Sequence, residues 1–317
     1  MTKLFKHYFL LVVRGMAMGA ADVVPGVSGG TIAFISGIYE ELINSLKSIG
    51  PKTVLIWKNQ GLKAAWQSIN GNFLLAVFGG VLISLFSLSK LIDVALHQYP
   101  ILVWAFFWGL VVASVWHLVR QIKFENLTIW AWMAFGAFVA LGISIAKPVA
   151  LPAYWWVLML GGAVAICAMI LPGISGSFIL LLLGLYPIFI DALATFNIVL
   201  LASFGAGCVI GLICFSRLLS WLLARYHYQT LALLTGFLIG SLNVIWPWKL
   251  VHEVRVDRHG DAIPVVQENV LPNVYAEVSG QASYLTEALI LAFFGFALVL
   301  FIEFFYKKWS SATPNSH

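Results

Sequence analysis

Charged residues are scarce in this chain. Asp, Glu, Lys and Arg make up only 10% of its 317 residues, whereas hydrophobic residues make up 61%. A soluble domain carries about 25% charged residues, because its surface faces water. The deficit excludes an ordinary soluble domain. It predicts an all-α polytopic membrane protein, since helices satisfy their backbone hydrogen bonds internally in lipid.

Cysteine and metal-ligand patterns are also sparse. The three cysteines are odd in number and lie inside apolar segments, which excludes a disulfide framework. They are Cys167, Cys208 and Cys214. The seven histidines are scattered without metal-ligand spacing, so we expect neither a structural metal nor a cofactor.

Long apolar runs are abundant, and a spanning helix needs about 20 residues. Six runs reach that length: 73–96, 101–119, 127–146, 198–222, 229–247 and 284–305. Two further regions, 5–46 and 153–195, are apolar but are broken by proline, glycine and charge. The polar stretch 248–283 is the one long loop, and its "VRVDRHGDAIPVV" predicts a small β-hairpin outside the cytoplasm.

Basic residues are distributed unevenly about these runs. Of the 18 Lys and Arg residues, eleven fall on the side of the N-terminus, four on the other side, and three within the apolar segments. The positive-inside rule then places both termini in the cytoplasm. The net charge of +5 mostly reflects this asymmetry, so no nucleic-acid partner is expected. Segment 47–70, with lysines beside Trp57 and Trp66, either lies on the cytoplasmic lipid surface or forms a solvated loop.

The N-terminal segment has some features of a secretory signal peptide, namely two lysines, an apolar patch and small residues. Its apolar run, Tyr8 to Val13, is shorter than usual and ends at Arg14. We therefore expect this segment to belong to the mature fold.

The chain contains an internal repeat at an offset of 147 residues. Pro25–Leu46 and Pro172–Leu193 are identical at 9 of 22 positions. The sequence thus divides into two halves, 1–148 and 149–317, each with a broken hairpin followed by three spans. Because three crossings are odd, the second half is predicted to be inverted relative to the first. Inverted repeats place a substrate site near the membrane midplane, between interrupted helices of both halves.

The broken hairpins, about 5–46 and 153–195, either cross the membrane twice or dip into it and return. Both forms preserve the topology. We favour the re-entrant form, since Arg14 and Asp22 on a lipid-facing span would each cost about 2.5–3.5 kcal/mol. The backbone freed at Pro25 and Gly26 also needs protein or water around it.

The repeated motif itself reads "PGVSGGT" in the first half and "PGISGS" in the second. A long apolar helix is expected to begin after each Pro-Gly step. Its first amides lack intrahelical partners and favour an anion, while glycine lets the ligand approach the backbone. The predicted binding residues are Pro25, Gly26, Ser28, Gly29, Gly30, Thr31, Pro172, Gly173, Ser175, Gly176 and Ser177. A serine there is also an ordinary N-cap, and small residues serve helix packing. Two matched copies favour an anion site over those interpretations.

Three charged residues near the apolar segments are further candidates. Arg14 is predicted to pair with a phosphate or with Asp22. Asp22 has Met169 as its counterpart, and this asymmetry suits either proton or sodium coupling or a salt bridge. Arg217 is a candidate headgroup ligand, with snorkelling to the interface as the alternative.

Two tyrosines follow the motif serines at the same spacing. Tyr39 and Tyr186 lie eleven residues after Ser28 and Ser175. On a continuous helix this puts each tyrosine on the face of its serine, about 16 Å away. They are predicted to line the path from the site to the membrane surface or to anchor at the interface.

Three stretches together resemble a known family. They are "RGMAMGAADVVPGVSGGTIAFISGIYEELI", "LPGISGSFILLLLGLY" and "GFLIGSLNVIWPWK". They are similar to the bacterial polyprenyl-phosphate translocase family, over nearly the whole chain. The resemblance implies a non-enzymatic transporter of the plasma membrane that returns undecaprenyl phosphate across it for reuse in cell-envelope synthesis. The tail would remain in membrane lipid.

Other functions fit parts of the same sequence pattern less well. Membrane undecaprenyl-pyrophosphate phosphatases use a Pro-Gly-x-Ser-Arg-Ser motif beside acidic residues, but Gly29 and Gly176 follow the serines here. Groups that would stabilise a pyrophosphate transition state are therefore missing nearby. A small-anion carrier could use the same helix ends, but it needs closed walls. A scaffold does not explain a duplicated polar motif. The sequence leaves open the driving force, the transport direction and whether the glycine-rich faces form a homo-oligomer.

Overall fold

The computed structural model describes residues 2–24, 27–256 and 262–311. The first half contains α1 (Thr2–Val23), α2 (Gly29–Ile35), α3 (Tyr39–Ser48), α4 (Pro51–Gln60), α5 (Leu62–Ser68), α6 (Gly71–Ser87), α7 (Ser89–Gln98), α8 (Pro100–Val119) and α9 (Leu127–Ile145). The second half contains α10 (Trp155–Ile170), α11 (Gly176–Leu182), α12 (Tyr186–Ala194), α13 (Ile198–Arg225), α14 (His227–Ser241), β1 (Lys249–Val256), β2 (Ala262–Asn269), α15 (Pro272–Ser279) and α16 (Leu285–Ser311).

The protein is helical with several helices suited to a membrane, as predicted. Within the described residues, α8, α9 and α13 are long and apolar enough to cross, and they coincide with the runs 101–119, 127–146 and 198–222. The count rises to five if the bent pairs α5–α6 (72°) and α11–α12 (104°) each act as one span. The hairpin predicted in the polar loop is also present, as antiparallel β1 and β2.

The structure corrects two of the predicted spans. Run 73–96 is two helices, because α6 ends before Leu88 and the polar α7 follows, with Lys90 in its first turn. Run 229–247 is helical only to Ser241, and α14 has 15 residues. That is about 22 Å of helix, shorter than the roughly 30 Å hydrocarbon core. Pro247 follows soon after and cannot continue a helix.

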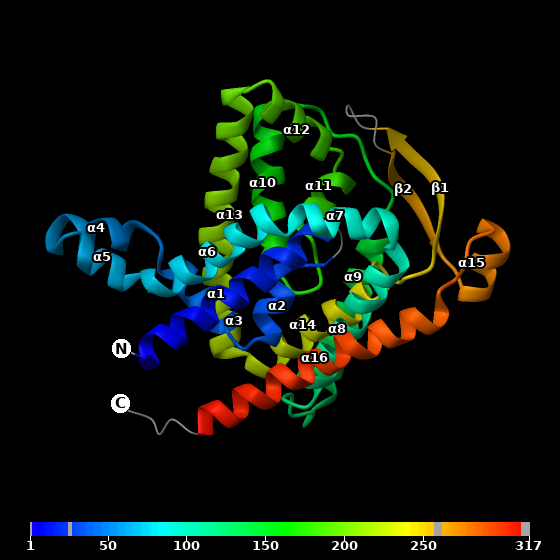
Figure 1. Ribbon diagram of the computed structural model, residues 1–317. Helices are drawn as coiled ribbons and strands as arrows, with labels where there is room; N and C mark the ends of the chain where they lie inside the picture. Colours follow the sequence, from blue (N-terminus) through cyan, green and yellow to red (C-terminus); the bar gives the residue numbers. More distant parts are fainter. Residues whose placement is uncertain (1, 25–26, 257–261, 312–317) are drawn as a thin grey trace.

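Four pairs of helices build the core of the fold. Helix α1 packs along α6 and α10 along α13, while α8 packs along α16 and α9 along α14 (Figure 1). Helix α1 begins and α16 ends at the lower left of this view, whereas the β-hairpin and α15 lie at the right. Glycines let the paired helices touch, since a Cβ on Gly80 would overlap Val12 O and one on Gly207 would overlap Met159 O.

These glycine contacts predict a large and site-specific loss of stability. A leucine at Gly80 or Gly207 must push two helices apart, and overpacking of this kind costs at least 1–3 kcal/mol, roughly. A Cβ on Gly79 or Gly205 would have nothing within 4 Å, so these two glycines are the matched controls. We expect Gly80→Leu and Gly207→Leu to lower the thermal unfolding midpoint in detergent strongly. Equal midpoints for all four leucine variants would contradict this packing.

The broken hairpins of the two halves have the same internal structure. Helices α2 and α11 both have seven residues, and their bounds differ by the offset of 147 at each end. Helices α1 and α10 end, and α3 and α12 begin, at the same offset. Gly37 (φ 73°) and Gly184 (φ 67°) adopt the left-handed conformation at the turn that follows. The prediction of a long helix after each Pro-Gly step is therefore wrong. Helices α2 and α11 have only seven residues each, and the turns at these glycines follow them.

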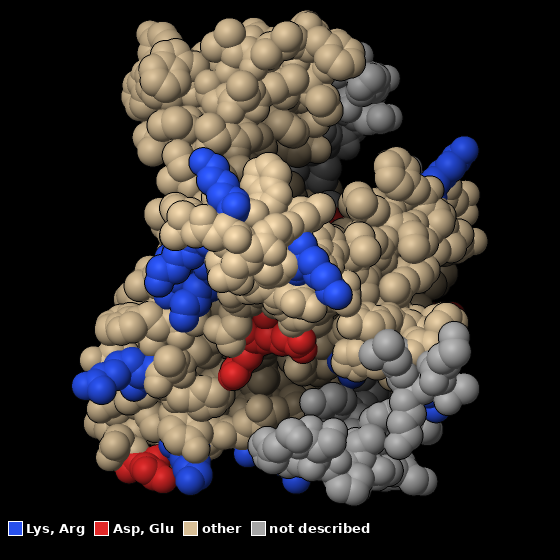
Figure 2. All heavy atoms as spheres, turned by 90° about the vertical axis from the view of Figure 1, so that its left-hand side faces the viewer, with Lys and Arg blue, Asp and Glu red and all other residues tan. Residues whose placement is uncertain are grey.

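Segment 47–70 forms α4 and α5, which lie apart from the core at the left of Figure 1. Helix α4 has no buried residue, and Leu55, Trp57 and Leu62 are exposed. Exposed apolar side chains beside lysines favour the interfacial helix over the solvated loop. Figure 2 shows this side of the molecule: the described residues at its top are almost all neither acidic nor basic, and Lys, Arg, Asp and Glu gather in the middle and lower parts.

Candidate functional site

The first motif is closed by its own side chains. Ser28 caps α2, and its Oγ accepts a hydrogen bond from the Gly30 amide at 3.1 Å. The Gly29 amide donates to Asp22 Oδ1 at 2.6 Å. Two of the first amides of α2 are thus occupied by a hydroxyl and a carboxylate. Pro25 and Gly26, also predicted to bind substrate, lie outside the described residues.

The second motif has similar backbone but different side-chain contacts. Ser175 precedes α11 and is buried, yet it forms no capping hydrogen bond. Its Oγ lies 2.9 Å from Ser177 Oγ instead. Gly173 adopts a left-handed φ of 82°, and a Cβ there would crowd Phe237 O of α14. Among the described residues, no side chain caps the start of α11; Ser175 and Gly176 are buried there, whereas Ser177 is exposed.

The two motifs meet although they are about 140 residues apart. Ser28 Oγ donates to Met169 O at 3.1 Å, and the Gly173 amide donates to Thr31 Oγ1 at 3.0 Å. A Cβ on Gly30 would lie 2.8 Å from Ile170 O, so the approach requires glycine. The structure therefore brings Ser28, Gly30 and Thr31 of the first motif against Gly173 and the end of α10, and we call this region the motif crossing.

Tyr39 belongs to the motif crossing rather than to a path toward the surface. Its ring packs edge-on against Phe34 at 4.7 Å, and its hydroxyl donates to Ile170 O at 3.1 Å. The break at Gly37 turns the chain back, so the 16 Å separation expected on one helix does not apply. Tyr186 starts α12 and packs on a separate cluster around Leu185. The two tyrosines thus have different surroundings, and their predicted role in lining a path or anchoring at the interface stays a prediction.

The predicted cations lie away from the motif crossing. Arg14 is eight residues before Asp22 on α1, about 12 Å along the axis, and Asp22 accepts a hydrogen bond from the Gly29 amide. The pairing of Arg14 with a phosphate or with Asp22 stays a prediction. Arg217 on α13 lies against Gly50, just after α3. Near it, Lys47 donates to Ser220 at 3.1 Å, which joins the two halves at that end of α13.

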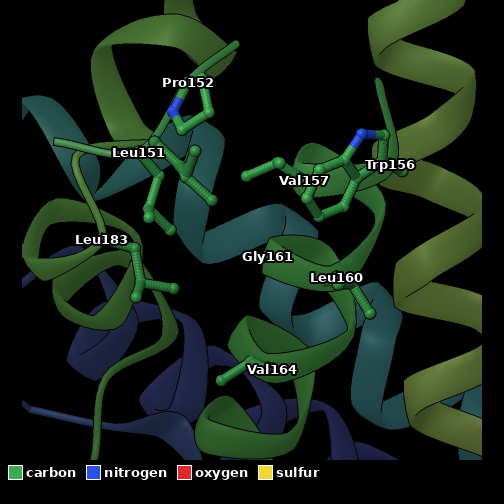
Figure 3. Close-up of a pocket in the computed structure, with 9 residues that line it drawn as sticks. Leu151, Pro152, Trp156, Val157, Leu160, Gly161, Val164 and Leu183 are labelled. Atoms are coloured by element: carbon green, nitrogen blue, oxygen red, sulfur yellow. The ribbon is translucent and has the colours of Figure 1, made fainter. Parts of the chain in front are cut away.

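An apolar groove of about 280 Å³ lies beside α10, the helix that leads into the second motif (Figure 3). Leu151 and Pro152 form one wall with Leu183, and Trp156, Leu160 and Val164 of α10 face them. The groove is open to the outside, and Leu160 is 55% exposed. An open hollow lined by hydrocarbon on a membrane protein suits a lipid chain.

Known proteins with similar sequences identify the family of this chain. A family model described as undecaprenyl phosphate translocase-like matches residues 18–263. The chain belongs to this undecaprenyl phosphate translocase-like family. A polyprenyl-phosphate transporter of Vibrio cholerae serotype O1 is 47% identical over 302 residues, covering 95% of this chain and 98% of that protein. A polyprenyl-phosphate transporter of Staphylococcus aureus is 32% identical over 257 residues, covering 74% of this chain and 85% of the relative. No solved structure matches this translocase-like chain.

One residue of this translocase-like protein was not singled out from the sequence. Lys249 follows α14, lies over the Trp104 ring at 4.3 Å and donates to Val244 O. The "WPWK" stretch offered a signal, but the contact with Trp104 depends on the tertiary fold. Burial lowers the pKa of this lysine from 10.5 to about 8.

The pKa of Lys249 predicts a pH-dependent stability. Between pH 8 and 10.5 the folded protein has released this proton while the unfolded chain retains it. Stability therefore rises with pH across that window, and the cost of burying the charge is present in full below it. We expect Lys249→Met to unfold at a higher temperature than wild type at pH 7 and to lack the rise toward pH 10. Parallel pH profiles in detergent would contradict this assignment.

Proposed function

We propose that this protein carries undecaprenyl phosphate across the bacterial plasma membrane for reuse in cell-envelope synthesis. The phosphate headgroup is held at the motif crossing. The observation that carries the proposal is the pair of hydrogen bonds joining the motifs, from Ser28 to Met169 and from Gly173 to Thr31. The polyprenyl-phosphate transporters named above support the lipid class.

An inverted pair of halves is part of this proposal. Gly15 and Gly19 of α1 meet Val77 and Val81 of α6 in the same order, so the two helices run parallel. Parallel neighbours begin on the same side, which supports a hairpin that returns to the side where it started. The contacts of α10 with α13 have the same order. Three crossings by α6, α8 and α9 then turn the second half upside down, with both termini in the cytoplasm.

The carboxylate of Asp22 controls access to the first motif. It holds the Gly29 amide that an anionic headgroup would otherwise take. Protonation or a bound sodium ion neutralises the carboxylate and weakens its charge-assisted hydrogen bond, which is the stronger kind. The phosphate then replaces it at Ser28, Gly29 and Gly30. In the second half, Ser175, Gly176 and Ser177 supply the matching ligands without a competing carboxylate.

The prenyl tail remains on the apolar side of the protein throughout this cycle. The groove beside α10 is lined by hydrocarbon and open to the surroundings, which supports a lateral route for a lipid. A carrier of free phosphate needs closed walls instead. Burying each CH₂ of the tail in such a groove contributes about 0.8 kcal/mol relative to water, but nearly nothing relative to lipid. The groove thus guides the tail more than it holds it.

Reconstitution tests the function directly. Purified protein in liposomes should move labelled undecaprenyl phosphate between leaflets and should leave inorganic phosphate outside. Undecaprenyl pyrophosphate, given as a control substrate, should release no phosphate. Uptake of inorganic phosphate alone would establish the small-anion carrier instead, and phosphate release from the pyrophosphate would establish the phosphatase. Either result would overturn the proposal.

A further inference from the structure

Two lysines outside the motif crossing occupy matching positions on the helices α8 and α14. Lys249 follows the end of α14 and lies over Trp104, in the second turn of α8, at 4.3 Å. Lys123 follows the end of α8 and lies over Tyr228, in the first turn of α14, at 5.9 Å. Each lysine thus comes after one helix and covers an aromatic ring at the start of the other. Cation–π contacts of this kind hold an ammonium in place.

The two lysine–aromatic pairs lie on opposite sides of the motif crossing. Gly173 packs against Phe237 of α14, and Tyr228 is nine residues earlier, about 14 Å along the axis. Helix α2 packs near Leu110 of α8, and Trp104 is six residues earlier, about 9 Å. Because the end of each helix meets the start of the other, α8 and α14 are antiparallel. The pairs therefore flank the crossing in opposite directions, which in the proposed topology are the directions of the two membrane faces.

Neither ammonium has a carboxylate partner among the described residues. Within the part of the chain that the structure describes, Lys249 lies over Trp104 and donates to the Val244 carbonyl, and Lys123 lies over Tyr228. An aromatic ring positions a cation but leaves its positive charge uncompensated, so each lysine keeps the capacity to bind an anion. A partly buried lysine without a counter-ion also costs stability, which favours a role other than folding. This cost in stability applies to Lys249 and not to Lys123, because the side chain of Lys123 is exposed.

We propose that Lys249 with Trp104 and Lys123 with Tyr228 are two stations for a phosphomonoester headgroup, one at each membrane face. The inference rests on the proposed function. Lys249 receives the headgroup on the extracytoplasmic side, and Lys123 receives it on the cytoplasmic side. Each ammonium attracts the dianionic phosphate toward the motif crossing. The aromatic ring holds the ammonium at a fixed depth relative to the membrane face.

Side-specific transport assays test the stations. Labelled undecaprenyl phosphate is presented to one leaflet of liposomes with the protein in a known orientation, and initial rates are measured against lipid concentration. Lys249→Met should weaken the apparent affinity about tenfold for lipid presented on the extracytoplasmic side only. Lys123→Met should do so on the cytoplasmic side only. Lys→Arg at either position should restore most of the affinity.

Control variants distinguish a failure of the two lysine stations from a failure of the proposed transport function. Lys147→Met and Lys58→Met, two lysines outside these pairs, should behave as wild type. Lys249→Met should also melt several degrees higher, so that its transport defect is not unfolding. If wild type moves the lipid but both methionine variants match the controls, or change both directions equally, the stations are refuted alone. An inactive wild type would refute the proposed function and the stations with it.

The same assay shows whether a station binds the phosphate group by itself or only when it is attached to the lipid. Inorganic phosphate is added on one side as a competitor. Competition in wild type that is lost in the methionine variant supports a station for the phosphate group itself. Absence of competition, together with the side-specific defects, supports a station that takes the phosphate only on its lipid. Competition that persists unchanged in the methionine variants would overturn the assignment to these lysines.

Discussion

Ser28→Ala combined with Ser175→Ala is expected to lower polyprenyl-phosphate transport about 100-fold, because each hydroxyl contributes roughly 1.5 kcal/mol to a charged headgroup. The single variants should differ. Among the residues that the structure describes, Ser175 Oγ pairs only with Ser177 Oγ, so Ser175→Ala should reduce transport without changing the unfolding midpoint. Ser28 bonds Met169 O and the Gly30 amide, so Ser28→Ala should also destabilise the protein. Initial rates in liposomes and thermal unfolding in detergent measure the two effects.

The matched control for the serine variants is Ser203→Ala. This hydroxyl bonds a carbonyl of its own helix, α13, and lies away from the crossing. Its loss should change neither transport nor the unfolding midpoint measurably. A well-folded double variant that transports at the wild-type rate would remove the hydroxyls from the headgroup site.

Asp22→Asn is expected to abolish the response of transport to an imposed proton or sodium gradient. An asparagine keeps an oxygen that can accept from the Gly29 amide, so the fold of α2 is retained. It cannot be neutralised by a cation, however, and it no longer repels the phosphate. We expect tighter binding of the lipid phosphate and a transport rate at least tenfold lower in the presence of the gradient.

The control for Asp22→Asn is Glu40→Gln. Glu40 is exposed, lies in the first turn of α3 and is close to His227. It should keep the gradient response of wild type. Rates with and without the gradient, measured in the same liposomes, compare the two variants. A gradient response that survives in Asp22→Asn would show that the carboxylate is a structural cap and that coupling lies elsewhere.

Much of the backbone plan could be predicted from the sequence. The offset of 147 residues located the hairpins of both halves, because the motif residues are constrained by close contacts as well as by local conformation. The end of α2 at Ile35, two residues before Gly37, could not be predicted, since a glycine in an apolar run is compatible with a continuing helix. Whether Gly37 adopts a positive φ depends on contacts that form only in the folded protein, such as the one between the rings of Phe34 and Tyr39 on either side of the turn.

The side-chain contacts of the site were less predictable. Two matched motifs indicated that Ser28 and Ser175 would be functional neighbours, but not that Ser28 bonds the opposite half while Ser175 does not. Arg217 was considered from its own segment alone, and its neighbour Gly50 is 167 residues away. The roles of these residues in binding stay predictions, because they depend on the substrate as well as on the fold.

An experimental structure with bound polyprenyl phosphate would locate the headgroup itself. We expect the phosphorus atom at the motif crossing, within hydrogen-bonding reach of the Ser28–Gly30 and Ser175–Ser177 segments, with Asp22 displaced from the Gly29 amide. Headgroup density held elsewhere, with Asp22 still on that amide and both serines out of reach, would contradict it.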